Sequence, residues 1–130
     1  MTYAAAVDTN VLVRIITNDQ VVVVGELVQE ILKAPESSLF IDTAVVAEVV
    51  YVLSSTQLYG YSRQDVARSI IDVCEIKQFT LDRKLTEQAL STFSNTKLDF
   101  VDCLVLAHQQ LGRAQAVLSR DKKLLRTAKN

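Results

Sequence analysis

The chain has 130 residues, nearly half of them hydrophobic, with no Trp and a formal net charge of −1. This length favours one domain with one core, and the hydrophobic content excludes a disordered chain. The balanced charge argues against a protein that coats nucleic acid, but it does not exclude a nuclease whose acidic side chains bind metal ions. A core of Val, Leu, Ile and Ala is typical of parallel strands covered by helices.

Cysteine usage and hydropathy indicate the compartment. Cys74 and Cys103 lie far apart in apolar stretches, without zinc-binding spacing. Such residues are typical of buried thiols in a reducing compartment. The N-terminal segment is too short and too polar for a signal peptide, and no apolar run reaches the length of a membrane span. We therefore expect a cytoplasmic protein that does not enter a membrane.

The first half of the chain alternates short apolar runs with longer amphipathic segments. We expect strands over residues 3–7 and 38–41, and helices over residues 10–17, 20–33 and 43–58. The first strand is expected to be buried, because it is entirely apolar up to Asp8.

The second half continues this alternation. Ser62 and Asp65 have the spacing of a capping box, which opens a helix. We expect helices over residues 62–76, 83–93, 99–111 and 121–128, with strands over residues 79–81 and 115–118. Strands that alternate with helices are typical of an α/β fold with a mostly parallel sheet, in which sites form at the carboxyl ends of the strands.

Four acidic residues stand beside strand ends or within apolar helical stretches: Asp8, Glu48, Asp102 and Asp121. A carboxylate next to buried surface is costly unless something neutralises it. Asp8 and Asp121 each precede a helix, so either one alone is explained by an N-cap. Glu48 lies mid-helix among valines and must reach solvent or pair with a charge. Together the four indicate a site that gathers negative charge.

Other polar residues have local explanations. Asp42 and Asp82 are interpreted as helix caps. Asp99, three residues before Asp102, is either a first-turn acid favoured by the helix dipole or part of the acidic group. The single histidine, His108, is interpreted as structural or exposed, so the usual serine- and zinc-hydrolase mechanisms lack their histidines. No glycine-rich loop supports nucleotide binding.

Carboxylates without His or Cys ligands favour Mg²⁺ or Mn²⁺. Two such ions about 4 Å apart can activate a water and stabilise the leaving oxygen of a phosphodiester. Beside Asp121, basic residues crowd the end of the chain and form either a solvated helix end or a phosphate-contacting edge. They are Arg120, Lys122, Lys123, Arg126 and Lys129.

Four sequence blocks contain these acids. They are VDTNVLVR at 7–14, TAVVAEVVYVL at 43–53, FVDCLVLA at 100–107 and LSRDKKL at 118–124. In this order and spacing they resemble the PIN domain, and most closely the VapC-type ribonuclease toxins of prokaryotic toxin–antitoxin pairs. Here Ser119 replaces a common Thr. The terminal LLRTAKN indicates a helix where many relatives continue into another short strand.

The resemblance implies a single PIN domain over residues 1–130, a Rossmann-like α/β/α sandwich with a mostly parallel central sheet of about four strands. It implies Mg²⁺- or Mn²⁺-dependent cleavage of RNA, with Asp8, Glu48, Asp102 and Asp121 as catalytic and metal-ligating residues. Residues with supporting roles are Thr9, Asn10, Asp99 and Ser119, and RNA contacts are assigned to Arg120, Lys122, Lys123 and Arg126. The family also implies a homodimer that is neutralised by a small antitoxin. The apolar run Val21–Val24 is expected to be covered by a partner chain.

Three other functions stay open. A PIN nuclease could serve RNA processing without a toxin role, and a small antitoxin gene directly upstream would separate the two. A phosphoacceptor receiver domain also clusters acids in an α/β fold, but it needs adjacent acids after its first strand, where this chain has Asp8-Thr9-Asn10. A degenerate PIN scaffold that only binds partners is disfavoured because all four acids are present.

Overall fold

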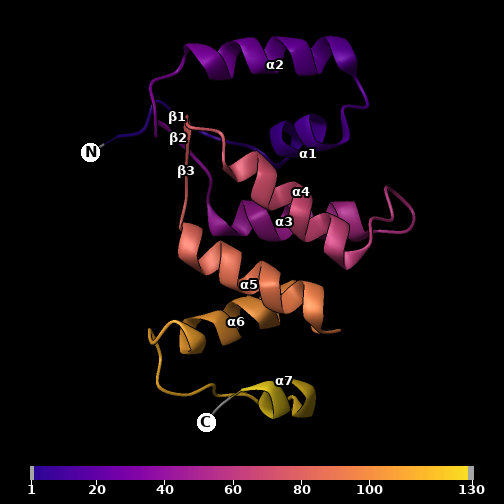
Figure 1. The fold of residues 1–130 in the computed structure, drawn as a ribbon, viewed down its shortest axis with the longest axis vertical. Coiled ribbons are helices and arrows are strands. Elements are labelled where there is room, and N and C mark those ends of the chain that lie inside the picture. The colour runs from indigo at the N-terminus through magenta and orange to yellow at the C-terminus, as the bar shows by residue number, and fades with distance from the viewer. Residues whose placement is uncertain (1, 129–130) are drawn as a thin grey trace. The chain divides into compact units, whose positions relative to one another are not determined.

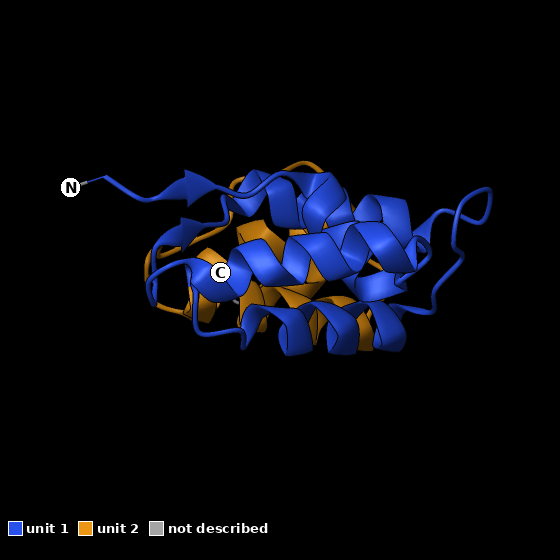
Figure 2. Cartoon of the chain, turned by 90° about the horizontal axis from the view of Figure 1, so that it is seen from above, with its two compact units in different colours: residues 1–82 blue, residues 83–130 orange. Residues whose placement is uncertain are grey.

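Figure 1 follows the helices and strands of the computed structural model, which describes residues 2–128. The chain divides into two compact units, Met1–Asp82 and Arg83–Asn130, coloured separately in Figure 2. Lys129 lies outside the described residues. No helix within residues 2–128 is long and apolar enough to cross a membrane.

The first unit contains a parallel sheet and four of the described helices. Its strands are β1 (Ala5–Ala6), β2 (Leu39–Phe40) and β3 (Phe79–Thr80). Its helices are α1 (Thr9–Thr17), α2 (Val21–Lys33), α3 (Thr43–Ser54) and α4 (Arg63–Cys74). The expected alternation of strands and helices is therefore confirmed in this unit.

The helix predicted over residues 43–58 is shorter than expected. It ends at Ser54, and the next residues fold into turns in which Ser55 O accepts bonds from Leu58 N and Gly60 N. Gly60 has φ of 62°, a left-handed conformation that glycine adopts at little cost. The turn chemistry thus ends the helix before the glycine itself is reached.

The sheet places three aspartates at one edge. β2 pairs in parallel with β1 on one side and β3 on the other. The strands end in register at Ala6, Phe40 and Thr80. An aspartate follows each of these strand ends by two residues: Asp8, Asp42 and Asp82. This is the carboxyl edge, where α/β folds place their sites.

β1 is exposed, so the expectation of a buried first strand is wrong. Ala5 and Ala6 are both exposed, and the neighbouring Tyr3 stacks on Phe40 with ring centroids 4.8 Å apart. β1 forms an edge of the sheet and has β2 as its neighbour there. An apolar run predicts a strand, but it does not distinguish an edge strand from a central one.

Helix α1 packs against α2, α3 and α4, and α3 packs against α4. The largest side chains that are fully buried in this unit include Leu12, Ile41, Val46, Val49, Leu53, Val66 and Ile70. The C-terminal end of α1 is tied to the turns after α3, because Asp19 accepts from Tyr59 OH at 2.8 Å and pairs with Arg14 at 3.0 Å. The Tyr59 hydroxyl, and then Arg14, hold the pKa of Asp19 below its ordinary value.

The second unit is helical within the described residues. It contains α5 (Arg83–Asn95), α6 (Phe100–Gln110) and α7 (Lys122–Thr127). α5 packs against α6, and α6 against α7. Phe93 and Phe100 meet edge to face, with ring centroids 5.9 Å apart. Both cysteines of the chain, Cys74 in the first unit and Cys103 in this one, are buried free thiols as predicted.

The strand predicted over residues 115–118 is absent, so the sheet has three strands in residues 2–128 rather than about four. Val117 is buried, but Gln115, Ala116 and Leu118 are exposed. Gln109 Nε2 donates to Gln115 O at 3.3 Å, and the segment stays irregular. The predicted α/β class with a parallel sheet and many helices is confirmed.

Candidate functional site

The first group of acids lies where β1 leads into α1. Asp8 is extended, with φ −83° and ψ 155°, and its Oδ1 accepts a 2.7 Å bond from the backbone N–H of Thr9. An N-cap normally accepts from the second or third amide of the helix. Asp42 has that geometry, since its Oδ1 accepts from Ala44 N, the second amide of α3, at 2.8 Å. Asp42 is therefore a cap as predicted, whereas Asp8 bonds only to the amide that follows it.

Thr9 connects Asp8 with Glu48. The Thr9 side chain is buried, and its Oγ1 donates a 2.9 Å hydrogen bond to Glu48 Oε2 on α3. Glu48 itself is exposed, so of the two outcomes expected from its apolar surroundings it reaches solvent. One residue thus donates to both carboxylates, through its backbone to Asp8 and through its side chain to Glu48.

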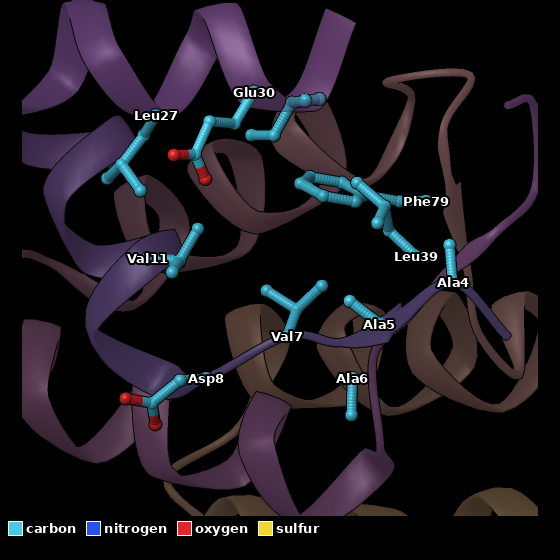
Figure 3. Close-up of a pocket in the computed structure, with 11 residues that line it drawn as sticks. Ala4, Ala5, Ala6, Val7, Asp8, Val11, Leu27, Glu30, Leu39 and Phe79 are labelled. Carbon is cyan, nitrogen blue, oxygen red and sulfur yellow. The ribbon is translucent and has the colours of Figure 1, made fainter. Parts of the chain in front are cut away.

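Asp8 stands at one end of an apolar cavity of about 360 Å³ between the sheet and α2 (Figure 3). Val7, Val11 and Leu27 line this cavity, and the carboxylate of Asp8 is directed away from Val7. Glu30 of α2 also lines the cavity, among the apolar side chains. The carboxylate of Asp8 is therefore presented outside the apolar space.

The second group of acids lies at the starts of α6 and α7. Asp99 is the N-cap residue of α6 but makes no side-chain capping bond, and Asp102 follows in the first turn. Asp121 is the N-cap of α7, where its Oδ1 accepts from Lys123 N at 2.8 Å and from Leu124 N at 3.2 Å. The amide of Asp121 in turn donates to Ser119 Oγ at 2.9 Å. Ser119 thus fixes the backbone that carries Asp121.

Asp102 is in an environment that disfavours its ionised carboxylate. Partial burial raises the pKa of Asp102 above its ordinary value, and the negative charges of Asp121 and then Asp99 raise it further. Burial and like charge both disfavour the ionised carboxylate. A cation placed among these residues would relieve both effects.

The acids of both groups lack basic partners. Within residues 2–128, no Arg or Lys forms an ion pair with any of these five carboxylates: Asp8, Glu48, Asp99, Asp102 and Asp121. By contrast, Asp19 pairs with Arg14, and Asp65 pairs with Arg68. Within residues 2–128, the two acidic groups therefore have no positively charged side chain paired with them.

The side chains in the two groups that could bind a metal ion are all carboxylates, and carboxylate oxygens are the ligands that Mg²⁺ and Mn²⁺ prefer. In the described part of the chain, no three or more His, Cys, Asp or Glu side chains form a group that could already hold a metal ion. Glu48 is joined to Asp8 through Thr9, and Asp102 interacts with Asp99 and Asp121. The meeting of both groups in one cleft stays a prediction.

The remaining candidates are exposed. Asn10 points from the first turn of α1, and His108 lies exposed on α6, consistent with its predicted role outside catalysis. The basic residues that the structure describes at the end of the chain are likewise exposed: Arg120, Lys122, Lys123 and Arg126. The bond from Thr9 to Glu48 was not predicted, because it joins residues 39 positions apart and no local pattern signals it.

The PIN domain family matches residues 5–130, so this chain belongs to the PIN domain family. PIN domains are generally nucleases, act on nucleic acid and use divalent metal ions. The matched residues include both acidic groups and run through both units of the structure. No curated protein and no solved structure matches the chain. The predicted PIN resemblance is confirmed, and the match does not distinguish the toxins from other PIN nucleases.

Proposed function

We propose that the protein is a Mg²⁺- or Mn²⁺-dependent endoribonuclease and that it acts in the cytoplasm as the toxin of a VapBC-type toxin–antitoxin pair. The observation that carries this proposal is the presence, on a PIN-domain chain, of two carboxylate groups without a basic partner. The pKa of Asp102 adds to this, because burial raises it first and the negative charges of Asp121 and Asp99 raise it further. Carboxylate oxygens are the ligands that divalent cations such as Mg²⁺ prefer, so a bound cation would neutralise these groups.

Asp8, Glu48, Asp102 and Asp121 would hold the cations as a single site of a single domain. A bound divalent cation supplies an activated water and stabilises the leaving oxygen of the phosphodiester. Thr9 orients the Glu48 carboxylate through Oγ1 and the Asp8 carboxylate through its amide. The amides of α7 hold Asp121 Oδ1, and Oδ2, which accepts no hydrogen bond from residues 2–128, would be the oxygen that binds a cation. Asp99 adds negative charge beside Asp102.

The reaction is tested with the purified protein and an RNA of defined sequence. We expect cleavage with Mg²⁺ or Mn²⁺, no cleavage in excess EDTA, and recovery when the metal is restored. A DNA strand of the same sequence should stay intact, and sequencing of the RNA ends would identify the cleaved bond. RNA cleavage that persists in EDTA, or an absence of cleavage with every divalent metal, would contradict the proposal.

The toxin role is tested separately from the chemistry. Expression of the active protein in a bacterial host should arrest growth, and co-expression of a small protein encoded directly upstream should restore it. That inhibitor is expected to place an arginine against the unpartnered carboxylates in bidentate geometry, in competition with the metal. Continued growth despite RNA cleavage would favour a role in RNA processing instead.

An exposed apolar surface on α2 supports the proposed homodimer. Val21, Val22 and Leu32 are 70%, 76% and 62% exposed, and a patch of this kind favours association. We expect a dimer in sedimentation experiments at micromolar concentration. Val22→Ser should weaken it by roughly tenfold or more, because a buried valine contributes about 1.5–3 kcal/mol.

Leu58→Ser is the matched control, because Leu58 is 61% exposed in the turns after α3. It should leave the dimer unchanged. A monomer at micromolar concentration, or a dimer that responds to Leu58→Ser and not to Val22→Ser, would remove α2 as the interface.

A further inference from the structure

The second unit contains an open cavity whose surface is largely apolar and which three basic residues border; it is called the basic cavity here. The segment before α6 and the helix α7 form its walls, and its volume is about 260 Å³. The lining residues are Thr96, Lys97, Leu98, Lys123, Arg126 and Thr127. Lys97, Lys123 and Arg126 are exposed, and within residues 2–128 none of them has an ion-pair partner. Three uncompensated cations around one cavity form a site for an anion such as a phosphate.

This basic cavity adjoins the second acidic group. Lys123 belongs to both, since its backbone N–H donates to Asp121 Oδ1 and the residue also lines the cavity. On the other wall, Leu98 is followed directly by Asp99. A phosphate in the basic cavity is therefore positioned beside, and not within, the carboxylates proposed to bind metal.

A second cavity lies next to the first and is lined by amides. It encloses about 470 Å³ and is lined by Gln88, Gln109, Gln110, Gln115 and Thr127. Thr127 lines both cavities. Gln88 Nε2 donates a 3.0 Å bond to Gln110 Oε1, which leaves Gln88 Oε1 as an acceptor and Gln110 Nε2 as a donor. An amide donor and acceptor held side by side match the hydrogen-bonding edge of a nucleobase.

We infer that the two cavities form one binding site for a nucleotide unit of the RNA strand, with a backbone phosphate in the basic cavity and its base edge in the amide cavity. The inference rests on the proposed ribonuclease function and adds a basis for substrate selection. Lys97, Lys123 and Arg126 position the strand, and Gln88 and Gln110 read it, because phosphate contacts position whereas base contacts specify. No RNA contact was predicted for Lys97 from the sequence alone. Lys122 does not line the basic cavity, so its predicted RNA contact lies outside this site.

The phosphate contacts are tested by binding of a fluorescent single-stranded RNA in EDTA, over a range of salt concentrations. The variant with Lys97→Gln, Lys123→Gln and Arg126→Gln should bind roughly tenfold more weakly. Its plot of log affinity against log salt should be shallower by about 0.7 for each phosphate that the variant no longer binds. Circular dichroism would verify that the variant is folded.

One single variant serves as the control. Lys84→Gln lies at the opposite end of α5 from Lys97, roughly 18 Å along the helix. It should bind RNA like the native protein. If it weakens binding as much as the triple variant, or if the triple variant binds normally, the basic cavity is not a phosphate site. Equal affinity for inorganic phosphate and for the RNA would also overturn the proposal, because a site that binds a base as well as a phosphate must bind the RNA more tightly.

The base contacts are tested by selection from an RNA pool randomised along its length. The native protein should prefer one base at one position, and the variant with Gln88→Met and Gln110→Met should lose that preference while keeping its salt dependence. Gln57→Met, at an exposed glutamine of the first unit, is the control and should keep it. A native protein without base preference, or a preference that survives in the double variant, would overturn the assignment.

The binding experiments separate this site from the proposed catalysis. With Mg²⁺, the triple lysine and arginine variant should show a KM raised about tenfold and an unchanged kcat, as expected for contacts made equally in the ground and transition states. RNA binding that depends on the cavity in a protein that never cleaves RNA would refute the ribonuclease and retain the site. Normal KM in the triple variant, with active cleavage, would refute the site and retain the ribonuclease.

Discussion

The two acidic groups belong to one PIN-domain chain but are held in different ways. In the first, the buried Thr9 donates hydrogen bonds to Asp8 and to Glu48, so both carboxylates are positioned by the protein itself. In the second, Asp102 is partly buried and is repelled by the charges of Asp121 and Asp99. The first group is thus oriented before any cation binds, whereas the second retains repulsion that a cation would relieve. Orientation by hydrogen bonds and repulsion between like charges are thus found in different parts of the chain.

The largest expected effect is the loss of cleavage when either group loses a carboxylate. Asp8→Asn and Asp102→Asn should each lower the cleavage rate by roughly a hundredfold or more, since even partners that only orient metal ligands are worth 10- to 100-fold. Both variants should also bind Mn²⁺ more weakly in calorimetry. The measurement is the single-turnover rate on a defined RNA at limiting Mg²⁺.

Asp42→Asn is the control for Asp8→Asn. Asp42 follows β2 as Asp8 follows β1, but it caps α3, and asparagine caps helices equally well. The control should keep native activity. If Asp8→Asn also keeps full activity while Asp102→Asn loses it, the metal site belongs to the second group alone. The first group would then have no role in cleavage.

A smaller effect is expected from Thr9, which acts through Glu48. Thr9→Val keeps the buried shape and the amide bond to Asp8 but removes the donor to Glu48, so the cleavage rate should fall by about tenfold. Thr9→Ser retains a hydroxyl and should recover most of the rate. Equal rates for the valine and serine variants would show that the first group needs no orientation by this bond.

Local patterns in the sequence predicted most of the fold. The helices start and end near the expected residues because their signals are local, such as Ser62, whose Oγ accepts from Asp65 N at 3.1 Å. Apart from the helix predicted over residues 43–58, which ends at Ser54, the errors concern strands. The exposure of β1 and the irregular course of residues 115–118 depend on which neighbours a short apolar run acquires, and the run itself does not encode this.

For the candidate site, the sequence indicated the residues but not their interactions. The acids were found because carboxylates in apolar surroundings are conspicuous, and Asp42 was correctly set aside as a cap. Their interactions required the fold: the sequence separates Thr9 from Glu48 by 39 positions. The basic cavity needed it too, because Lys97 and Lys123 become neighbours only when α7 and the segment before α6 enclose it.

The smallest expected effect concerns the repulsion in the second group, measured without metal. In EDTA, an NMR titration should give Asp102 a pKa above its ordinary value, and Asp121→Asn should lower that pKa by removing one of its causes. A carboxyl whose pKa is raised on folding contributes stability that is fully present below the unfolded pKa and lost as the pH rises through the folded pKa. Asp102→Asn should therefore be more stable than the native protein at neutral pH, with a difference that shrinks as the pH falls to about 4 and below. Mg²⁺ should reverse the order, because a ligand that binds the folded state stabilises it and the variant has lost part of the site. Chemical denaturation of both proteins at several pH values, with and without Mg²⁺, measures this crossover. A native protein that is more stable than Asp102→Asn at neutral pH in EDTA would mean that the second group is not under repulsion.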